Sequence, residues 1–301
     1  MMHSVQYLKI NDEASGQRLD NFLIRTLKGV PKSHVYRIIR SGEVRVNQKR
    51  SQAATRLMAC DNVRIPPIRD STTKVIVVKE ALQKRLHAAI LYEDSELLVL
   101  NKPSGIAVHG GSGISLGIIE ALRKTRVDLI YLELVHRLDR ETSGCLLLAK
   151  KRNMLRQIQA LLAERKVKKT YWACVDKVWR GPRTVVVDQP LKKNHLQSGE
   201  RIVVINPQGK EAQTQFRLLE NYTQNCLVEV YPKTGRTHQI RVHSAHIGHP
   251  ILGDHKYGQM DEGRLYLHAR QIQFTLNGKD YKFAAEVDAQ FSEKLRCLKG
   301  I

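Results

Sequence analysis

The stretch from residue 171 to residue 231 contains five short strand-like runs with no helical pattern between them: YWACV (171–175), TVVV (184–187), RIVVI (201–205), QTQFRLL (213–219) and CLVEVY (226–231). β-Branched and aromatic side chains are frequent in these runs, as is typical of strands. A regularly alternating α/β domain would place a helix after each strand. We therefore predict an α+β fold with a mixed, mainly antiparallel sheet.

Periodic segments on both sides of this stretch extend the same domain. Apolar spacing predicts strands at 97–100 and 146–148, and helices around 116–122, at 154–165 and at 237–247. A final hairpin is predicted to turn at Asn277 and Gly278. The sequence thus predicts one domain over residues 85–301, without an internal repeat.

The charge balance of the chain points to a polyanionic partner. The 301 residues are enough for two domains, and they include 50 Lys and Arg against 29 Asp and Glu, a net charge of +21. Such an excess is typical of nucleic-acid-binding proteins. More than half of it lies between residues 17 and 85, which favours RNA binding by this part of the chain.

Cysteine usage and hydropathy favour a cytoplasmic location for the protein. The five cysteines are scattered and odd in number, which favours a reducing compartment. No apolar stretch approaches the roughly 20 residues needed to span a bilayer, and the first residues lack the apolar core of a signal peptide. We expect a cytoplasmic protein that does not interact with membranes.

Two short helices and a small ribbon are predicted in the basic segment. Apolar residues recur at helical spacing from Leu19 to Leu27 and again from Val35 to Ile39, and Ser33 is placed to cap the second helix. A solvated basic surface is the alternative to RNA binding. The residues predicted to contact RNA here are Arg18, Lys32, Ser33, Arg37, Arg40, Arg45 and Lys49.

This segment resembles the S4-like RNA-binding domain found in a ribosomal small-subunit protein, tyrosyl-tRNA synthetases and several RNA-modifying enzymes. The resemblance rests on RLDNFL (18–23) and PKSHVYRIIRSGEVRVNQKR (31–50) and covers residues 17–80. It implies that the second helix and the turn after it face the phosphate backbone. Residues 72–85, with an apolar patch at 75–78, are predicted to form a strand and a linker.

The polar loop HRLDRETSG (136–144) is set between apolar runs and is the first candidate for chemistry. Asp139 is flanked by Arg137 and Arg140, and nearby positive charge keeps a carboxylate ionised, as a nucleophile requires. A structural ion pair within the loop, involving Glu141, is the alternative.

The segment TGRTHQIRVH (234–243) is the second candidate. Thr237 is predicted to cap a helix that places His238 and Arg241 on one face. The histidines of this region do not have the spacing of a known zinc site, so no metal is predicted. A metal-dependent RNA hydrolase that uses Asp139, Asp254 and these histidines is the alternative.

Five motifs in order resemble the RluA/RluC family of ribosomal large-subunit pseudouridine synthases, and its RluC members most closely: NKPSGIAVHGG (101–111), HRLDRETSG (136–144), KVKKTYWACV (166–175), KTGRTHQIRVHSAHIGHPILGD (233–254) and LYLHA (265–269). The resemblance implies an isomerase that converts uridine to pseudouridine in RNA without cofactor or metal. It implies 23S ribosomal RNA, or an assembling large subunit, as the partner. Another structured RNA and a non-catalytic assembly factor are the alternatives, and a monomer is the default.

The same resemblance implies roles for individual residues. Asp139 would be the catalytic nucleophile, Tyr171 would lie against the uracil, and Arg241 would pair with Asp139. Ile240 would form an apolar wall of the base pocket, and Arg137 would enter the space left by the extruded uridine. A nucleotide must leave the base stack before its glycosidic bond can react, so aromatic stacking and phosphate contacts are needed. Lys168 and Lys169 are predicted to contribute to the RNA surface near Tyr171, and Lys102 to support the site.

Overall fold

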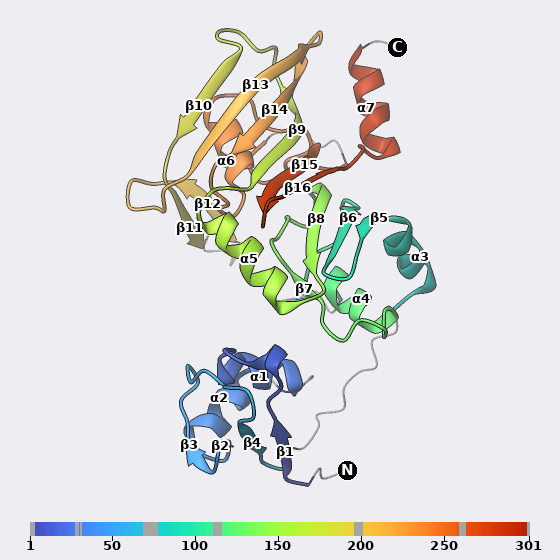
Figure 1. Ribbon diagram of the computed structural model, residues 1–301. Helices are drawn as coiled ribbons and strands as arrows, with labels where there is room; N and C mark the ends of the chain where they lie inside the picture. Colours follow the sequence, from blue (N-terminus) through green and yellow to red (C-terminus); the bar gives the residue numbers. More distant parts are fainter. Residues whose placement is uncertain are drawn as a thin grey trace. The chain divides into compact units, whose positions relative to one another are not determined.

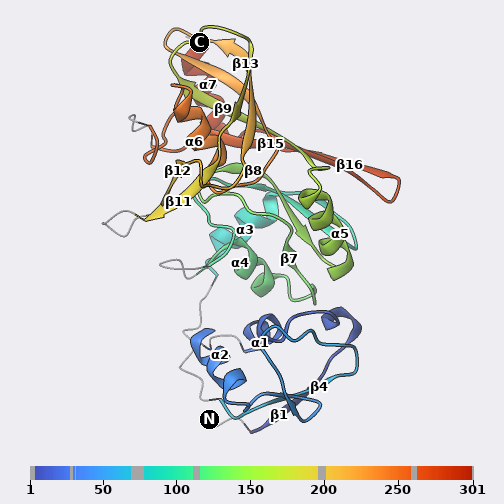
Figure 2. The same ribbon diagram turned by 90° about the vertical axis from the view of Figure 1, so that its left-hand side faces the viewer.

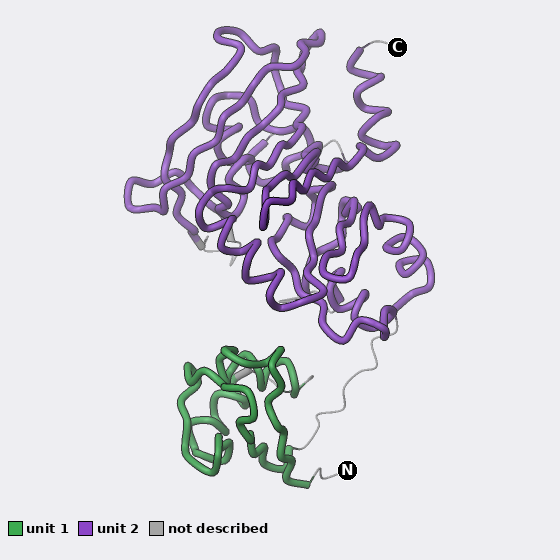
Figure 3. The backbone as a smooth tube through the Cα atoms, in the orientation of Figure 1, with its two compact units in different colours: residues 1–77 green, residues 78–301 purple. Residues whose placement is uncertain are grey.

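The computed structural model describes residues 4–27, 30, 32–68, 78–110, 116–195, 201–258 and 263–299. The chain forms two compact units, Met1–Val77 and Val78–Ile301 (Figure 3). Within the described residues, no helix combines the length and apolarity needed to cross a membrane. Each unit is described separately below.

The first unit packs two helices against a small antiparallel sheet (Figure 1). Leu23, Val35 and Val63 are among the buried residues that join helices and sheet. The elements are β1 (Gln6–Lys9), the 3₁₀ helix η1 (Asp12–Ala14), α1 (Leu19–Thr26), α2 (Lys32–Arg40), β2 (Arg45–Val46), β3 (Lys49–Arg50) and β4 (Asn62–Ile65), with strand order β1-β4-β2-β3.

The two predicted helices and the ribbon are confirmed, with two differences. Strand β1 precedes residue 17 and pairs along its whole length with β4, so the sheet of this unit starts earlier than the sequence indicated. The prediction that Ser33 caps the second helix is wrong. Helix α2 begins at Lys32, which places Ser33 in its first turn.

The second unit is built on one large sheet, as the α+β prediction requires. Its strands in the described part of the chain follow the order β10-β13-β14-β9-β15-β8-β6-β5, and β16 and β7 pair with β15 and β8. Only the β15–β8 pair is parallel among them. The bounds are β5 (Ile90–Glu93), β6 (Leu97–Lys102), β7 (Glu133–Leu134), β8 (Ser143–Ala149), β9 (Lys168–Asp176), β10 (Thr184–Asp188), β13 (Gln213–Asn221), β14 (Asn225–Pro232), β15 (Leu267–Leu276) and β16 (Lys279–Ala284).

Helices and a separate hairpin complete this unit. The hairpin consists of β11 (Leu191–His195) and β12 (Arg201–Ile205). The β15–β16 hairpin turns at Asn277 and Gly278 as predicted, with φ of 51° and 75°, and it extends away from the rest of the sheet in Figure 2. The helices are α3 (Glu80–Ala88), α4 (Ile118–Thr125), α5 (Arg152–Ala163), α6 (Gln239–His246) and α7 (Ala289–Lys299).

Strands β6 and β8 are buried on both faces and form the centre of the core. Leu98 and Leu146 point toward α3 and α4, whereas Val99 and Leu147 point toward α5 and the β15–β16 hairpin. This two-sided burial explains why both strands read as uninterrupted apolar runs. It also holds the loop before β8 in place.

The segment between the predicted domains differs from the sequence-based expectation. Residues 80–88 form helix α3 rather than part of a linker. Leu82 and Leu86 of this helix pack with the same hydrophobic cluster as the buried residues of α4. Most of the apolar patch at 75–78 lies outside the described residues. The second compact unit therefore includes residues that the sequence assigned to the connection.

Candidate active site

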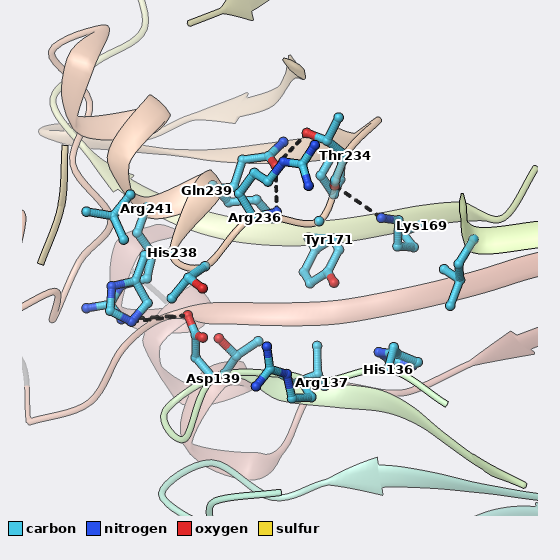
Figure 4. Close-up of a pocket in the computed structure, with 18 of the residues that line it drawn as sticks. His136, Arg137, Asp139, Lys169, Tyr171, Thr234, Arg236, His238, Gln239 and Arg241 are labelled. Atoms are coloured by element: carbon cyan, nitrogen blue, oxygen red, sulfur yellow. Dashed lines mark hydrogen bonds and ion pairs between the residues drawn. The ribbon is translucent and has the colours of Figure 1, made fainter. Parts of the chain in front are cut away.

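A cavity of about 1050 Å³ lies in the second unit (Figure 4). Much of its lining comes from three segments: the loop at 135–142 before β8, the first half of β9, and the turn at 232–241 that leads into α6. Both sequence segments selected for chemistry therefore reach the same cavity.

Asp139 faces this pocket with a side chain that is 30% exposed. Its Oδ2 lies 3.7 Å from Nη1 of Arg241 and 3.9 Å from Nε2 of His238. The loop ion pair considered as an alternative forms instead between Arg140 and Glu141, at 3.3 Å. Asp139 is thus left to the pocket.

The NKPSG segment fixes the backbone directly after Asp139. Nζ of the fully buried Lys102 donates hydrogen bonds of 2.7–2.9 Å to the carbonyl oxygens of Pro103, Ile106 and Arg140. The Ser104 hydroxyl donates to the Glu141 carbonyl at 2.7 Å. Burial lowers the pKa of Lys102 to about 7, but three carbonyl acceptors require three N–H donors, so the ammonium form fits this position. Lys102 therefore fixes the backbone of the loop that carries Asp139.

The sequence predicted that Arg241 pairs with Asp139. In the structure the Arg241 guanidinium lies closer to Asp254 than to Asp139. The buried Arg241 guanidinium binds Asp254 through two hydrogen bonds of 2.8 and 2.6 Å, and its Nη1 is the group nearest to Asp139. Burial opposes the charge of Arg241, but the bonds to Asp254 and the charges of Asp254 and Asp139 raise its pKa. Asp254, considered from sequence only as a metal ligand, thus anchors this arginine.

The start of α6 also differs from the prediction. The helix begins at Gln239 and its N-cap is His238, which has a left-handed backbone with φ of 53°. Thr237 therefore is not the cap. The turn before the helix is fixed instead by the buried Gln239, which accepts hydrogen bonds from the Thr234 hydroxyl and the Arg236 backbone N–H. Sequence spacing gave no signal for this role of Gln239.

Tyr171 and Ile240 contribute to the apolar lining of the pocket. Tyr171 packs against two hydrophobic clusters, and burial together with the nearby Asp139 charge raises its pKa. Ile240 is 7% exposed and lies beside it on the lining. Arg137 lines the same pocket and is exposed to solvent. Figure 4 shows Tyr171, Asp139 and Arg241 around one cavity.

The pleat of β9 separates the two lysines predicted to act together. Lys169 and Tyr171 line the large pocket, and Nζ of Lys169 donates to the Thr234 carbonyl at 3.2 Å. Lys168, Thr170 and Trp172 line a second cavity of about 640 Å³, which Lys169 also borders. Burial lowers the pKa of Lys169 to about 8. Only Lys169 therefore belongs to the wall of the candidate active site.

The predicted RNA contacts of the first unit have different local partners. Arg18 is committed to the buried Asp20, with hydrogen bonds of 3.1 and 2.6 Å. Arg37 lies 3.7 Å from Glu43. Backbone carbonyls accept from Arg45 at 3.4 Å. The remaining predicted contacts lie on or directly after α2 and on β3: Lys32 at the start of the helix, the exposed Ser33 and Arg40 within it, and the exposed Lys49.

The histidines of the second motif have separate hydrogen-bonding roles. His243 is buried between the Thr214 hydroxyl and the Gln189 carbonyl, and His249 stacks on Trp179 with ring centroids 4.6 Å apart. His238 contacts Tyr257, whose role the sequence did not indicate. Among the described residues, no three His, Cys, Asp or Glu side chains gather as a metal site would require.

Comparison with known proteins identifies the class to which this fold and pocket belong. The family model for RNA pseudouridylate synthases matches residues 96–246, and the S4 domain model matches residues 17–63. The chain belongs to the RNA pseudouridylate synthase family and is an isomerase that forms pseudouridine. The predicted order, an S4 domain followed by a synthase domain, is confirmed.

Individual relatives extend the similarity to almost the whole chain. The chain is 49% identical over 309 residues to ribosomal large subunit pseudouridine synthase C of Pasteurella multocida, covering 98% of this chain and 94% of that protein. It is 49% identical over 312 residues to the protein of the same name from Escherichia coli strain K12, with coverage of 99% and 97%. The structure of human RNA pseudouridylate synthase domain containing 4 matches with a TM-score of 0.61 at 31% identity, covering 73% of this chain and 96% of that one.

Proposed function

We propose that this protein isomerises specific uridines of large-subunit (23S) ribosomal RNA, either free or in an assembling subunit, as a cytoplasmic monomer. Asp139 is the proposed nucleophile, residues 17–80 bind the RNA and residues 85–301 catalyse. The names of the relatives support this substrate. The observation that carries the proposal is the Asp139 carboxylate, which faces the pocket 3.7 Å from a buried arginine and close to Tyr171.

The pocket is suited to an extruded uridine. Tyr171 and Ile240 offer an aromatic face and an apolar wall for the uracil, and stacking of a base on an aromatic side chain contributes about 1–3 kcal/mol. This contribution offsets the few kcal/mol needed to extrude a nucleotide. The exposed Arg137 lies at the pocket lining, from which it can enter the space that the uridine leaves.

Arg241 stabilises the negative charge on which the chemistry depends. Three routes begin from an ionised Asp139: attack on the anomeric carbon of the ribose, attack on the uracil ring, and proton removal at the sugar. Each needs a carboxylate held in one orientation. Because Asp254 fixes the guanidinium, Arg241 presents Nη1 to Asp139 without a reorganisation step.

Replacement of the nucleophile tests the proposal directly. We expect Asp139→Asn to fold and bind RNA but to lose more than about 10³-fold of the rate, because an amide cannot attack or accept the proton. The measurement incubates the full chain with unmodified 23S ribosomal RNA and maps pseudouridine by carbodiimide-dependent primer-extension stops. Glu141→Gln is the matched control, since it removes a partly exposed carboxylate two residues away.

New stops that appear with the wild type and Glu141→Gln but not with Asp139→Asn support both reaction and residue. Turnover by Asp139→Asn near the wild-type rate would refute the nucleophile assignment. Binding without any stops in the wild type would refute naked 23S ribosomal RNA as the substrate. A subsequent incubation with large-subunit precursor particles would then separate a particle substrate from a non-catalytic assembly role.

A further inference from the structure

His238 is the second nitrogen-bearing side chain directed at Asp139. Its Nε2 lies 3.9 Å from the carboxylate Oδ2, and its Nδ1 lies 2.8 Å from the Tyr257 hydroxyl. Figure 4 shows the imidazole and the carboxylate facing each other across the edge of the pocket. The His238 side chain is only 16% exposed to solvent.

The Tyr257 hydroxyl determines which nitrogen of His238 carries the proton. This hydroxyl accepts a hydrogen bond of 2.9 Å from the backbone N–H of Val203, which can act only as a donor. Its own proton is therefore available to His238 Nδ1, which is the acceptor in its reach among the described residues. In a neutral imidazole one nitrogen accepts and the other donates. Nδ1 is thus the acceptor, and the N–H is on Nε2, toward Asp139.

Local structure holds the imidazole in this orientation. Asp254 accepts from the backbone N–H of both Lys256 and Tyr257, so the same carboxylate that fixes Arg241 also fixes the loop of Tyr257. His238 has a left-handed backbone, which disfavours side chains with a Cβ by about 1–2 kcal/mol. A glycine would adopt this backbone without that cost. The position therefore supplies an imidazole at the expense of local stability.

We propose that His238 is a positioning residue for Asp139, which donates Nε2–H to the carboxylate Oδ2 and leaves Oδ1 directed at the substrate, with Tyr257 fixing the tautomer. This inference rests on the proposed role of Asp139. A distance of 3.9 Å is longer than a hydrogen bond, so the bond forms when the two groups approach by roughly 1 Å. Such contacts commonly tighten when substrate binds.

The charges around His238 favour a neutral ring. Asp139, Arg241, Asp254 and Lys256 all act on it, and Tyr257 caps its other nitrogen. Burial lowers the pKa of His238 below its ordinary value, and Arg241 and Lys256 act in the same direction against the two carboxylates. A neutral His238 can orient the Asp139 carboxylate through Nε2–H without transferring a proton that would neutralise it.

Three variants of the full-length enzyme separate positioning from mere packing. We expect His238→Leu to reduce the single-turnover rate about 10²-fold with unchanged RNA affinity, as is typical when one donor to a charged group is lost. His238→Gln, which retains an N–H donor, is expected to recover at least a factor of about ten of that loss. Tyr257→Phe is expected to lower the rate about tenfold, because without the hydroxyl the proton of His238 can lie on either ring nitrogen. His246→Leu, on the exposed side of α6, is the matched control with wild-type activity.

One further readout does not depend on stability or packing. Nitrogen-15 NMR of histidine-labelled protein is expected to show the Nε2–H tautomer for the resonance that His238→Gln removes. An Nδ1–H tautomer would overturn the proposal.

The remaining outcomes are equally decisive. Equal rates for His238→Gln and His238→Leu, or a loss confined to RNA affinity, would contradict positioning of the carboxylate. Asp139→Asn is measured in parallel, because full activity of that variant would refute the nucleophile assignment itself rather than the role of His238. Thermal melting identifies any variant that fails to fold, and the NMR measurement on wild-type protein then still tests the tautomer.

Discussion

The imidazole of His136 lies at the wall of the pocket as a neutral group. Its Nε2 accepts a hydrogen bond of 3.2 Å from the Leu147 backbone N–H, and burial, together with the Lys169 charge, lowers its pKa to about 4. The unfolded chain would protonate this histidine near pH 6.5. His136 thus makes the stability of the domain that contains Asp139 sensitive to pH.

This difference in pKa predicts acid sensitivity. Between about pH 6.5 and pH 4 the unfolded state binds a proton that the folded state does not, so the free energy of unfolding falls as the pH falls. Between pH 7 and pH 5 we expect a loss of about 2 kcal/mol from this residue. Chemical denaturation at the two pH values measures it, with His136→Gln as the comparison. An equal loss in that variant would show that His136 is not the source.

At the scale of single residues, sequence reasoning selected the candidate nucleophile but not the groups that hold it in place. Asp139 was selected from its polar loop, the cations beside it and the HRLD motif, and its side chain lies at the pocket. The partner of Arg241 was missed because Asp254 follows it by 13 positions in a loop, where no helical spacing relates the two. Lys102, by contrast, was assigned a supporting role, and its carbonyl contacts agree with that role.

Glycine at position 144 allows β8 and β15 to meet beside the loop that carries Asp139. Gly144 has φ of 107°, and a side chain there would collide with the backbone of Ala269 on β15. Gly105 also has a positive φ, of 83°, but nothing lies within 4 Å of its missing Cβ. A side chain would therefore be strained at either position, but only at position 144 would it also collide with neighbouring backbone.

Alanine at these two positions separates the effects. We expect Gly105→Ala to lower the free energy of unfolding by about 1 kcal/mol through strain alone. Gly144→Ala is expected to lower it by about 3 kcal/mol or more and to reduce activity, because the parallel pair must move apart. Chemical denaturation and a turnover assay measure both. Similar losses for the two variants would mean that close packing at Gly144 contributes little.

Elements with a strong hydrophobic pattern were predicted from the sequence, and elements with a weak hydrophobic pattern were missed. Strands β6 and β8 were evident as apolar runs because both of their faces are buried. Helix α3 has only one fully buried side chain, Leu86, among exposed charged residues, so it was taken for part of a linker. The mostly exposed β1 gave no alternation to detect.

At the scale of the molecule, the excess of positive charge should determine how tightly RNA is held. We expect the triple variant Arg40→Gln, Arg45→Gln, Lys49→Gln to bind RNA more weakly. Each lost phosphate contact should reduce the slope of log affinity against log salt by roughly 0.7–0.9. Filter binding across a salt series measures the slope. A variant that neutralises Lys282, Arg296 and Lys299 is the charge-matched control, and an equal change in both would contradict a specific role of the first unit.

The order of the strands in the large sheet could not be predicted from the sequence. The division into a basic front and a strand-rich remainder follows from composition, which is local information. The pairing of β15 with β8 brings together His268 and Ser143, which are 125 positions apart. Nothing in either segment alone specifies that partner, because the choice depends on how the whole chain packs.

The position of β15 in the sheet also sets when the enzyme becomes active during its own synthesis. One half of the sheet, with β9, and the other half, with β8, are joined only through β15 among the described strands. A ribosome that has translated as far as residue 260 has already made Asp139, Tyr171 and Arg241, yet the strand that aligns them does not exist. We therefore expect the nascent chain to remain inactive until β15 has left the exit tunnel and has paired with both halves of the sheet.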